Sequence, residues 1–512
     1  MKFKLLIISL VFLGTRATGQ DVTRQFEEVK HVTIRNMGTI TKNNEVKGYY
    51  SFYEFDKVNR KTLLYRLNLL DENLNELGTK DITGPRDWEL ISSGYDGNNF
   101  CFKFWDERKK TFELKVYDQD ANEVTSNTLK VNYNPKSAEF MRYKEVVGQE
   151  LAILGNNGFV NYTFNDPNNA FIISYVDGAS KNSWQQTYQP EGKSKVMAPT
   201  FLNGNKEMIL TAVSRIDKGF DNLKTKQSIL GTRTDDGTRL FDLSTEFGDN
   251  HVVPINAIFE GEKIIIIGLN YKTSKTYTTA PDGLAFLEID KTGKILKSNF
   301  KNIEESLGKF LPMEDHKLKD GYYLYIHDIV KTNHNTSLII AEKFKKGSAA
   351  GAAASIAVSM FANIGAHLKL ENMVVIEYDA DGNVVQAQEI PKAEGSADDL
   401  PAYAALFPPY LLASVANILG HMDYMYKTNN TDNSQITFSF IDYGRIDDDS
   451  KKTNNFGQIK YKNGKISVDK IAIKKEKATF THLYRAKPGH VLKIDYFKKD
   501  KKLTMNLITL NN

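Results

Sequence analysis

The sequence predicts an all-β protein, a β-propeller of eight four-stranded blades, with seven blades as the alternative count. Two observations lead to this prediction. Similar β-rich units return along the chain at roughly 50 to 60 residues, the spacing expected when each unit forms one blade against its neighbours. Each unit also contains a tight turn rich in Asp, Asn and Gly between two β-rich runs, which is typical of a hairpin.

The hairpins are the clearest part of the repeat, because Gly, Asn and Asp tolerate the positive φ of a two-residue turn. They include LAFLEIDKTGKILKSNF from Leu284 and MVVIEYDADGNVVQAQEI from Met373. We interpret DADGN at Asp379 as such a turn and not as a calcium loop, since it lacks the downstream Glu that a calcium loop needs. A more apolar strand precedes each hairpin, as in the stretches Phe100 to Trp105, Glu207 to Val213, Lys263 to Leu269 and Gln435 to Ile441.

The last unit, from about Phe480 to Leu510, supplies three strands before the chain ends. A missing fourth strand would leave an open sheet edge, which proteins avoid. We therefore expect Arg24 to His31 to supply that strand and close the ring. The third unit is the least regular, and we assign its first two strands to Glu150 to Gly155 and Gly158 to Phe164.

The first 19 residues have the pattern of a signal peptide: Lys2 and Lys4, then an apolar run, then the small residues Ala17-Thr18-Gly19. The prediction is a protein exported to the periplasm or the exterior, with residues 20–512 as a single propeller domain. Without Lys2, Lys4 and Arg16, the 67 basic residues fall to 64, against 63 acidic ones. This balance argues against nucleic acid as a partner. Cys101, the single cysteine, lies in the apolar run FCFKFW, so we expect a core residue and not a nucleophile.

The length of the connections indicates which face carries function. Within a blade, the turn between the first and second strands (a–b) and that between the third and fourth (c–d) lie on one face, and they are short throughout. The long connections all belong to the opposite face, where binding residues of a rigid scaffold concentrate. They are Ser214 to Lys226, Tyr271 to Asp282, Lys301 to Asp320, Phe344 to Glu371, Pro391 to Gly420 and Asp442 to Asn455.

Two of these connections, 344–371 and 391–420, read as helical insertions that form a cap on the disc. The first is uncharged from Gly347 to Leu368, and the second is interrupted by Pro408-Pro409, with Asp398 or Asp399 as a helix N-cap. We expect no transmembrane anchor, although contact of the cap with a membrane surface or with a partner protein stays an alternative. The residues assigned to the cap surface are Ile356, Met360, Phe361, Ile364, Leu411 and Leu412.

Histidines fall near the expected start of the first strand in several units, where side chains converge on the mouth of the central channel. Neutral imidazoles there could bind a metal or act as general bases, although chance alignment is the simpler interpretation. His316 lies just upstream of the same position in the sixth unit. The candidate channel-mouth residues are His31, His251, His421, His482, Glu89 and Asp423.

The chain resembles uncharacterised secreted β-propeller proteins of Gram-negative bacteria, a family of unknown function, through its leader and blade repeats such as VVIEYDADGNVV and FLEIDKTGKIL. The resemblance implies an envelope or extracellular binding role. No hydrolase, metalloprotease, P-loop or dithiol motif occurs, and no cofactor is expected. The sequence therefore favours a module that binds or scaffolds a protein or glycan ligand. A polysaccharide hydrolase or lyase with its site at the channel mouth is the alternative.

Overall fold

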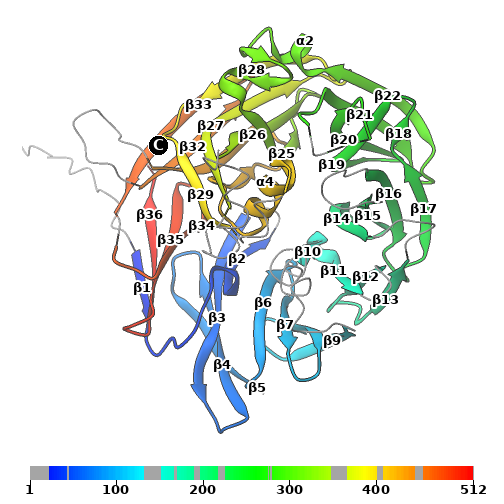
Figure 1. The fold of residues 1–512 in the computed structure, drawn as a ribbon. Helices are drawn as coiled ribbons and strands as arrows, with labels where there is room; N and C mark the ends of the chain where they lie inside the picture. Colours follow the sequence, from blue (N-terminus) through cyan, green and yellow to red (C-terminus); the bar gives the residue numbers. More distant parts are fainter. Residues whose placement is uncertain are drawn as a thin grey trace, which may run out of the picture.

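The computed structural model describes residues 22–42, 45–131, 151–165, 170–189, 196–216, 225–274, 276, 279–347, 366–400, 407–443, 454–474 and 476–510. In these residues the chain forms eight four-stranded antiparallel blades, arranged as a ring around a central axis (Figure 1). The predicted β-propeller and its count of eight blades are therefore confirmed. The leader expected at residues 1–19 lies outside the described residues.

Blades are numbered here in chain order. Each of the first four consists of consecutive strands paired in sequence order, as the repeat predicts. Their strands are β2 (Met37–Lys42), β3 (Glu45–Lys57), β4 (Thr62–Asp71) and β5 (Glu76–Pro85) in blade 1; β6 (Trp88–Tyr95), β7 (Phe100–Asp106), β8 (Thr111–Tyr117) and β9 (Glu123–Lys130) in blade 2; β10 (Leu151–Ile153), β11 (Phe159–Asn165), β12 (Ala170–Val176) and β13 (Ser183–Tyr188) in blade 3; β14 (Val196–Gly204), β15 (Met208–Ile216), β16 (Thr225–Arg233) and β17 (Arg239–Ser244) in blade 4.

Blades 5 and 6 each add a short strand to their four, whereas blade 7 has four strands only. Blade 5 has β18 (Glu246–Phe247) paired to its first strand, and blade 6 has β29 (Gly395–Leu400) paired to its third. Their strands are β19 (Asn250–Glu260), β20 (Lys263–Tyr271), β21 (Gly283–Asp290) and β22 (Ile295–Asn302) in blade 5; β25 (Tyr323–Lys331), β26 (Ser337–Lys346), β27 (Ala366–Tyr378) and β28 (Val384–Ile390) in blade 6; β30 (Tyr424–Asn429), β31 (Gln435–Asp442), β32 (Asn454–Lys462) and β33 (Lys465–Ile473) in blade 7.

The ring closes through the N-terminal strand, as the missing fourth strand predicted. Blade 8 contains β34 (Phe480–Arg485), β35 (His490–Phe497) and β36 (Lys502–Thr509), and β1 (Val22–Phe26) pairs antiparallel with β36. The strand begins two residues earlier than expected and ends before His31. Because β1 fills the edge of β36, the first and last segments of the chain hold each other in place.

The c–d turns of blades 5 and 6 are hairpin turns, as predicted, but they are longer than two residues and only their Gly has positive φ. In the turn after β27, the carboxylate of Asp379 accepts hydrogen bonds from the backbone N–H groups of Asp381 and Asn383, and Gly382 has a φ of +76°. The turn after β21 repeats this arrangement at Asp290, with Gly293 at +83°. The Asp379 oxygens thus serve the turn itself, in agreement with the interpretation of DADGN as a hairpin.

The core is divided between the faces of neighbouring blades, because each central strand is buried on both sides. In β20, Ile264 and Ile266 pack against blade 4 residues such as Leu210, whereas Ile267 belongs to the cluster shared with blade 6. All three are at most 1% exposed. Cys101, in β7, is fully buried, and burial raises the pKa of its thiol, as expected for a core residue.

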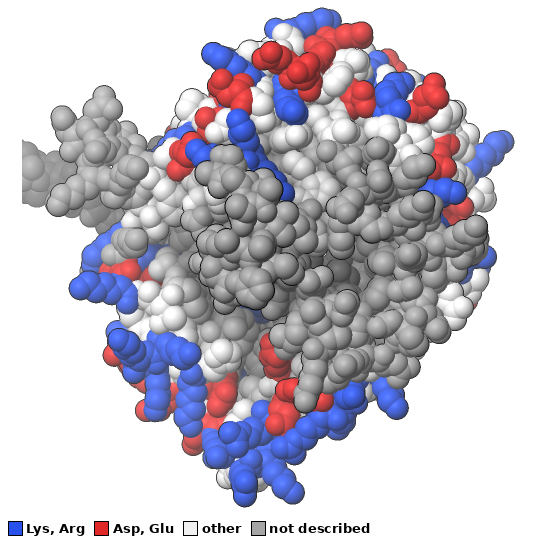
Figure 2. All heavy atoms as spheres, in the orientation of Figure 1, with Lys and Arg blue, Asp and Glu red and all other residues white. Residues whose placement is uncertain are grey.

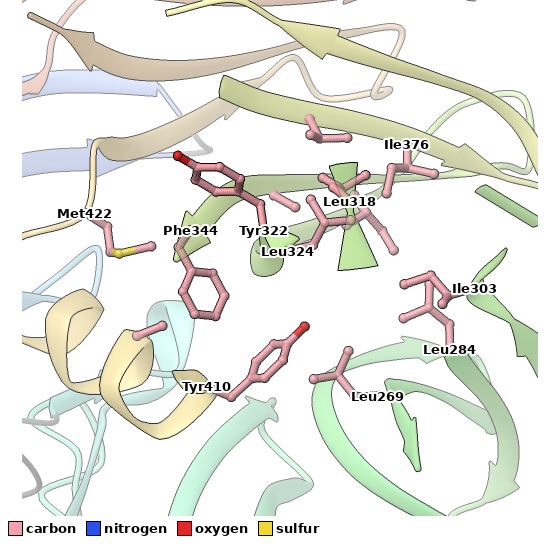
Figure 3. Close-up of a cluster of buried hydrophobic side chains, with 14 of the residues drawn as sticks. Leu269, Leu284, Ile303, Leu318, Tyr322, Leu324, Phe344, Ile376, Tyr410 and Met422 are labelled. Carbon is pink, nitrogen blue, oxygen red and sulfur yellow. The ribbon is translucent and has the colours of Figure 1, made fainter. Parts of the chain in front are cut away.

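The insertions on the loop face differ from the expected helical pair. Residues 395–400, which were expected to begin a helix near Asp398 or Asp399, form strand β29 instead, because they find an open edge beside the extended β27. A helix follows at α4 (Pro409–Ile418), and its Tyr410 packs against Phe344 and Tyr323 in the largest apolar cluster (Figure 3). Of the helical insertion expected at 344–371, the described ends are strand instead, residues 344–346 in β26 and residues 366–371 in β27. Residues 348–365 lie outside the described residues, and so do Ile356, Met360, Phe361 and Ile364.

The described part of the chain contains no helix that combines the length and apolar character needed to cross a membrane.

Candidate functional site

The face with the long connections is built from blades 4 to 7 and their joining segments. Between β22 and β25 the chain forms the short helix α2 (Ile303–Leu307) and a two-stranded hairpin, β23 (Met313–Glu314) with β24 (Lys317–Leu318). β29 and α4 follow in the next connection and lie near the centre of the ring (Figure 1). Figure 2 shows charged side chains of both signs around the rim in the same view.

A cavity of about 440 Å³ opens on this face at the junction of blades 5 and 6. Its described lining residues come from the b–c connection of blade 5, from the β23–β24 hairpin and from the first residue of β25. Its lining residues are Lys272, Thr273, Thr279, Ala280, Asp282, Asp315, His316, Lys317 and Tyr323. Carboxylates, ammonium groups, hydroxyls and one aromatic ring thus meet in one open space.

His316 is positioned by a tight two-residue hairpin turn. Asp315 and His316 are its two central residues, and both have positive φ, +50° and +61°. Positive φ at both central positions is the ordinary geometry of such a turn between paired strands. The backbone N–H of His316 donates to Glu304 Oε1 at 2.6 Å, which holds the turn against the first turn of α2.

The imidazole of His316 lies between two carboxylates. Its Nε2 is 3.9 Å from Asp282 Oδ1, and its Nδ1 is 3.9 Å from Glu304 Oε1. Asp282 is held in turn by the backbone N–H of Lys272, which donates to Oδ2 at 2.7 Å. The ring is 37% exposed, so a ligand in the cavity could reach it. The imidazole of His316 can therefore donate a proton to a ligand in the cavity or accept one from it.

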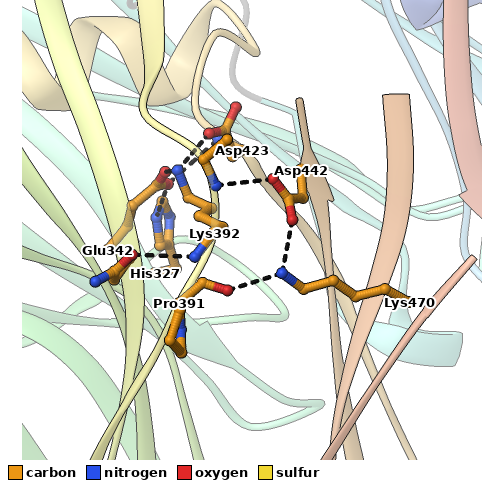
Figure 4. A network of polar contacts seen from close by, with 9 residues as sticks. His327, Glu342, Pro391, Lys392, Asp423, Asp442 and Lys470 are labelled. Atoms are coloured by element: carbon orange, nitrogen blue, oxygen red, sulfur yellow. Dashed lines mark hydrogen bonds and ion pairs between the residues drawn. The ribbon is translucent and has the colours of Figure 1, made fainter. Parts of the chain in front are cut away.

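A second polar group, buried between blades 6 and 7, contains Asp423 (Figure 4). Lys392 Nζ lies 2.6 Å from Asp423 Oδ2 and 3.2 Å from Glu342 Oε1, and His327 Nε2 lies 3.1 Å from Glu342 Oε2. An ionised carboxylate only accepts hydrogen bonds, so the imidazole N–H donates to it. The side chains of Lys392, Glu342 and His327 are 0% exposed, and that of Asp423 is 5% exposed.

Burial and neighbouring charges shift the pKa values of Glu342 and Asp423 in opposite directions. Burial alone would raise the pKa of Glu342, but the hydrogen bond from His327 and the charge of Lys392 outweigh burial and hold it below its usual value. At Asp423, burial raises the pKa to about 7, repulsion by Glu342 adds to the rise, and Lys392 opposes it. Lys392 thus occupies the position that a metal cation would take between the two carboxylates.

This buried group fastens the connection between blades 6 and 7 to both blades. Lys470 Nζ donates to Asp442 Oδ2 at 2.6 Å and to the carbonyl of Pro391 at 2.8 Å, and the backbone N–H of Ala393 donates to Asp442 Oδ1. Both ends of the connection that carries β29 and α4 are therefore anchored by ion pairs. Because its atoms are enclosed, we interpret this group as a support of the loop face and not as a ligand-contacting site.

The predicted channel-mouth residues lie at separate blades. Glu89 is exposed at the start of β6, His251 lies 3.6 Å from Glu246 at the start of β19, and His482 is in β34. Burial lowers the pKa of His482 to about 4, so its ring is neutral at physiological pH. His421 lies three residues after the end of α4, where its backbone N–H donates to the carbonyl of Ala416 at 2.9 Å.

His31 differs from the prediction, because it is not at the start of a first strand. It forms an isolated bridge with Glu54 of β3. Among the residues that the structure describes, no three His, Cys, Asp or Glu side chains form a group able to hold a metal ion.

The two described cap residues also lie differently from the prediction. Leu412 is 0% exposed and packs into the core with Ala413 and Ala416, so it does not belong to the cap surface. Leu411 is half-buried, and the exposed apolar residue of α4 is Ile418, at 41%. Leu412, Ala413 and Ala416 face the core because they pack in the same apolar cluster as Phe344.

The sequence pattern missed His327, Glu342 and Lys392. Glu342 and His327 are polar residues inside apolar strands, a signal that marks either a buried ion pair or a site. Lys392 follows Pro391 in a connection, where a lysine is usually solvated. Only the packing of blades 6 and 7 brings the three together.

The fold and the ring closure define the class of protein: an eight-bladed β-propeller with an elaborated loop face. The chain belongs to the family of unknown function DUF6770, whose sequence profile matches residues 1–511. No curated protein matches the sequence.

Solved structures of other proteins are similar at low identity. Prolyl oligopeptidase B from Galerina marginata has a TM-score of 0.40 at 8% identity, over 91% of this chain and 56% of its own. The polysaccharide lyase Uly1 has 0.37 at 8%, over 83% and 90%, and the WD40 domain of SCAP from fission yeast has 0.35 at 7%, over 95% and 97%. The chain spans about half the length of the prolyl peptidases it matches.

Proposed function

We propose that this protein is an exported binding module that takes a protein or glycan ligand on its elaborated loop face, in the periplasm or outside the cell. The observation that carries the proposal is the cavity of about 440 Å³ at the junction of blades 5 and 6, since every lining residue belongs to the elaborated connections or to the first residue of β25. Its volume falls within the range of small-ligand sites.

The character of the lining supports a polar ligand. Asp282, Asp315, Lys272 and Lys317 present charges of both signs, and Tyr323 adds an aromatic ring. Hydroxyl-rich and amide-rich ligands suit such a wall, because each polar group can find a partner and the ring can cover an apolar ligand face.

The test is a screen of the purified mature protein against an array of defined oligosaccharides and a library of soluble peptides. Any ligand found is then measured with the variants Asp282→Asn and His316→Ala. Asp381→Asn is the matched control, because it changes an exposed carboxylate in a c–d turn on the opposite face. We expect both cavity variants to weaken binding about tenfold or more and the control to leave it unchanged. Equal binding by all four proteins would refute the assignment of the face.

A polysaccharide hydrolase or lyase is the second candidate, and the position of His316 between Asp282 and Glu304 favours it over other enzymes. A general acid or base needs a titratable group within reach of a bound substrate, and the exposed imidazole meets that condition. The same screen separates the two functions. Release of new reducing ends or unsaturated products, lost in His316→Ala, would identify an enzyme, whereas recovery of the ligand intact identifies a binding module.

Export is tested separately by cell fractionation. We expect the full-length chain in the periplasmic or extracellular fraction and a chain that lacks residues 1–19 in the cytoplasm. Cytoplasmic recovery of both forms would contradict export.

A further inference from the structure

A second cavity lies on the opposite face, between blades 7 and 8, where all turns are short. Its volume is about 360 Å³. The a–b turn of blade 7, the a–b turn of blade 8 and the start of β3 surround it. It is lined by Glu45, Val46, Tyr426, Thr428, Asn429, Asn430, Gln435, Thr437, Gln458, Lys460, Arg485, Ala486, Lys487, Pro488, Gly489, His490 and Leu510.

The cavity lies in the interface between blades 7 and 8, which is less apolar than the interface between blades 4 and 5. Between blades 4 and 5 the facing strands are filled by residues such as Leu210, Ile229 and Ile264. Between blades 7 and 8 an apolar cluster around Phe456 and Leu483 fills only part of the contact. The remaining surface of blade 7 is polar and leaves open space, although apolar side chains there would stabilise the ring more.

The strand register explains how the polar surface is assembled. Thr428 in β30 pairs with Thr437 in β31, which pairs with Lys460 in β32. Side chains of directly paired residues lie on the same face of a sheet, so these three form a row across blade 7. Gln458 lies two residues before Lys460 and therefore shares its face. The row continues into the amides of the a–b turn, Asn429, Asn430 and Gln435.

The charge of the lining is mainly positive. Lys460, Arg485, Lys487 and His490 contribute basic groups, and Glu45 is the one acid among the lining residues, with its carboxylate 2.7 Å from Lys47 Nζ. Arg485 is half-buried in the wall, and guanidinium groups keep their charge under all physiological conditions. Lys460 is held 2.7 Å from Asp469, which fixes its direction.

We propose that this cavity binds a saccharide of one or two residues that carries a carboxylate, such as a uronic acid. The side-chain amides of Gln435 and Gln458 and the hydroxyls of two threonines offer donors and acceptors for sugar hydroxyls, and Arg485 with Lys487 attracts the carboxylate. The site is independent of the loop face and of the function proposed for it, because the two cavities share no lining residue.

The experiment uses the purified mature protein and isothermal titration with digalacturonate. Its neutral counterpart, a digalactoside, and galactose 1-phosphate are the comparison ligands. Two variants alter the cavity: Arg485→Gln removes a cation, and Gln458→Glu adds a negative charge in the row beside Lys460. The matched control is Lys206→Gln, an exposed lysine in the a–b turn of blade 4 on the same face.

We expect saturable binding of digalacturonate, at least tenfold tighter than that of the neutral disaccharide. Each cavity variant should weaken it tenfold or more, and Lys206→Gln should not change it. Thermal melting of each variant shows whether the fold is intact, and Gln458→Glu keeps the test valid if Arg485→Gln does not fold. The proposal is overturned by the absence of saturable binding, by equal binding of the neutral disaccharide, by tighter binding of the sugar phosphate, or by binding that survives both variants.

Discussion

Replacement of Lys392 by methionine tests whether the buried ion group supports the loop face. The side chain is 0% exposed, and its ammonium is within 3.2 Å of both Glu342 and Asp423. Methionine fills a similar volume but leaves two buried carboxylates without a cation. Removal of one partner from a buried ion pair costs about 3 to 5 kcal/mol, because the remaining charge is not compensated.

The expected change in melting temperature follows from the size of the chain. An unfolding entropy of about 2.1 cal/mol/K per residue gives about 1 kcal/mol/K for a chain of 512 residues. A loss of 3 to 5 kcal/mol therefore lowers the melting temperature by about 3 to 5 °C at pH 8. Differential scanning calorimetry measures this shift directly. Lys297→Met is the matched control, since Lys297 and its partner Asp381 are 48% and 68% exposed and such pairs contribute little.

The pH dependence adds a second criterion. The depressed pKa of Glu342 contributes stability that is present above the unfolded value, about 4.3, and is lost as the pH falls through the folded value. The penalty of Lys392→Met should therefore shrink toward acid pH, where the carboxylates take up protons. A variant that melts within about 1 °C of the wild type at pH 8, as the Lys297 control should, would refute the claim that Lys392 compensates both acids.

Four further outcomes are expected. The pKa of Asp423 is raised to about 7 from an unfolded value of about 3.9, so between these two pH values the folded state holds a proton that the unfolded state has lost. This residue therefore makes the wild type less stable as the pH rises from about 4 to about 7. Asp423→Asn should flatten the profile of stability against pH in this range, and an unchanged profile would contradict the raised pKa. Deletion of residues 22–26 should lower the melting temperature and promote self-association, since it exposes the edge of β36; a monomer with unchanged melting by light scattering and calorimetry would show that closure is dispensable. Phe26→Ala, at the end of β1, should cost about 3 to 5 kcal/mol in denaturant titration unless the cluster around Tyr53 and Leu503 collapses into the space. Cys101 should react with a thiol reagent only after unfolding, and rapid labelling of the native protein would contradict its burial.

The blade architecture was predictable from the sequence because its signals are local. A pair such as Asp381-Gly382 predicts a turn from its own residue types, and a run such as Ile264 to Ile267 predicts a strand that is buried on both faces. Neither prediction requires knowledge of the rest of the chain. Even the closure by β1 followed from an unpaired strand at the end of the repeat, although the strand begins two residues before the predicted start.

The buried ion group and the polar row of blade 7 could not be predicted in the same way, because their residues are distant in sequence. Lys392, Glu342 and Asp423 meet only when blades 6 and 7 pack, and the row from Thr428 through Thr437 to Lys460 exists only in the register of three strands. The strand at 395–400 also depended on tertiary structure, since the open edge of β27 decided its conformation. Local turn chemistry and hydrophobic pattern thus determined the propeller, whereas long-range packing decided which charges are enclosed and where the two cavities open.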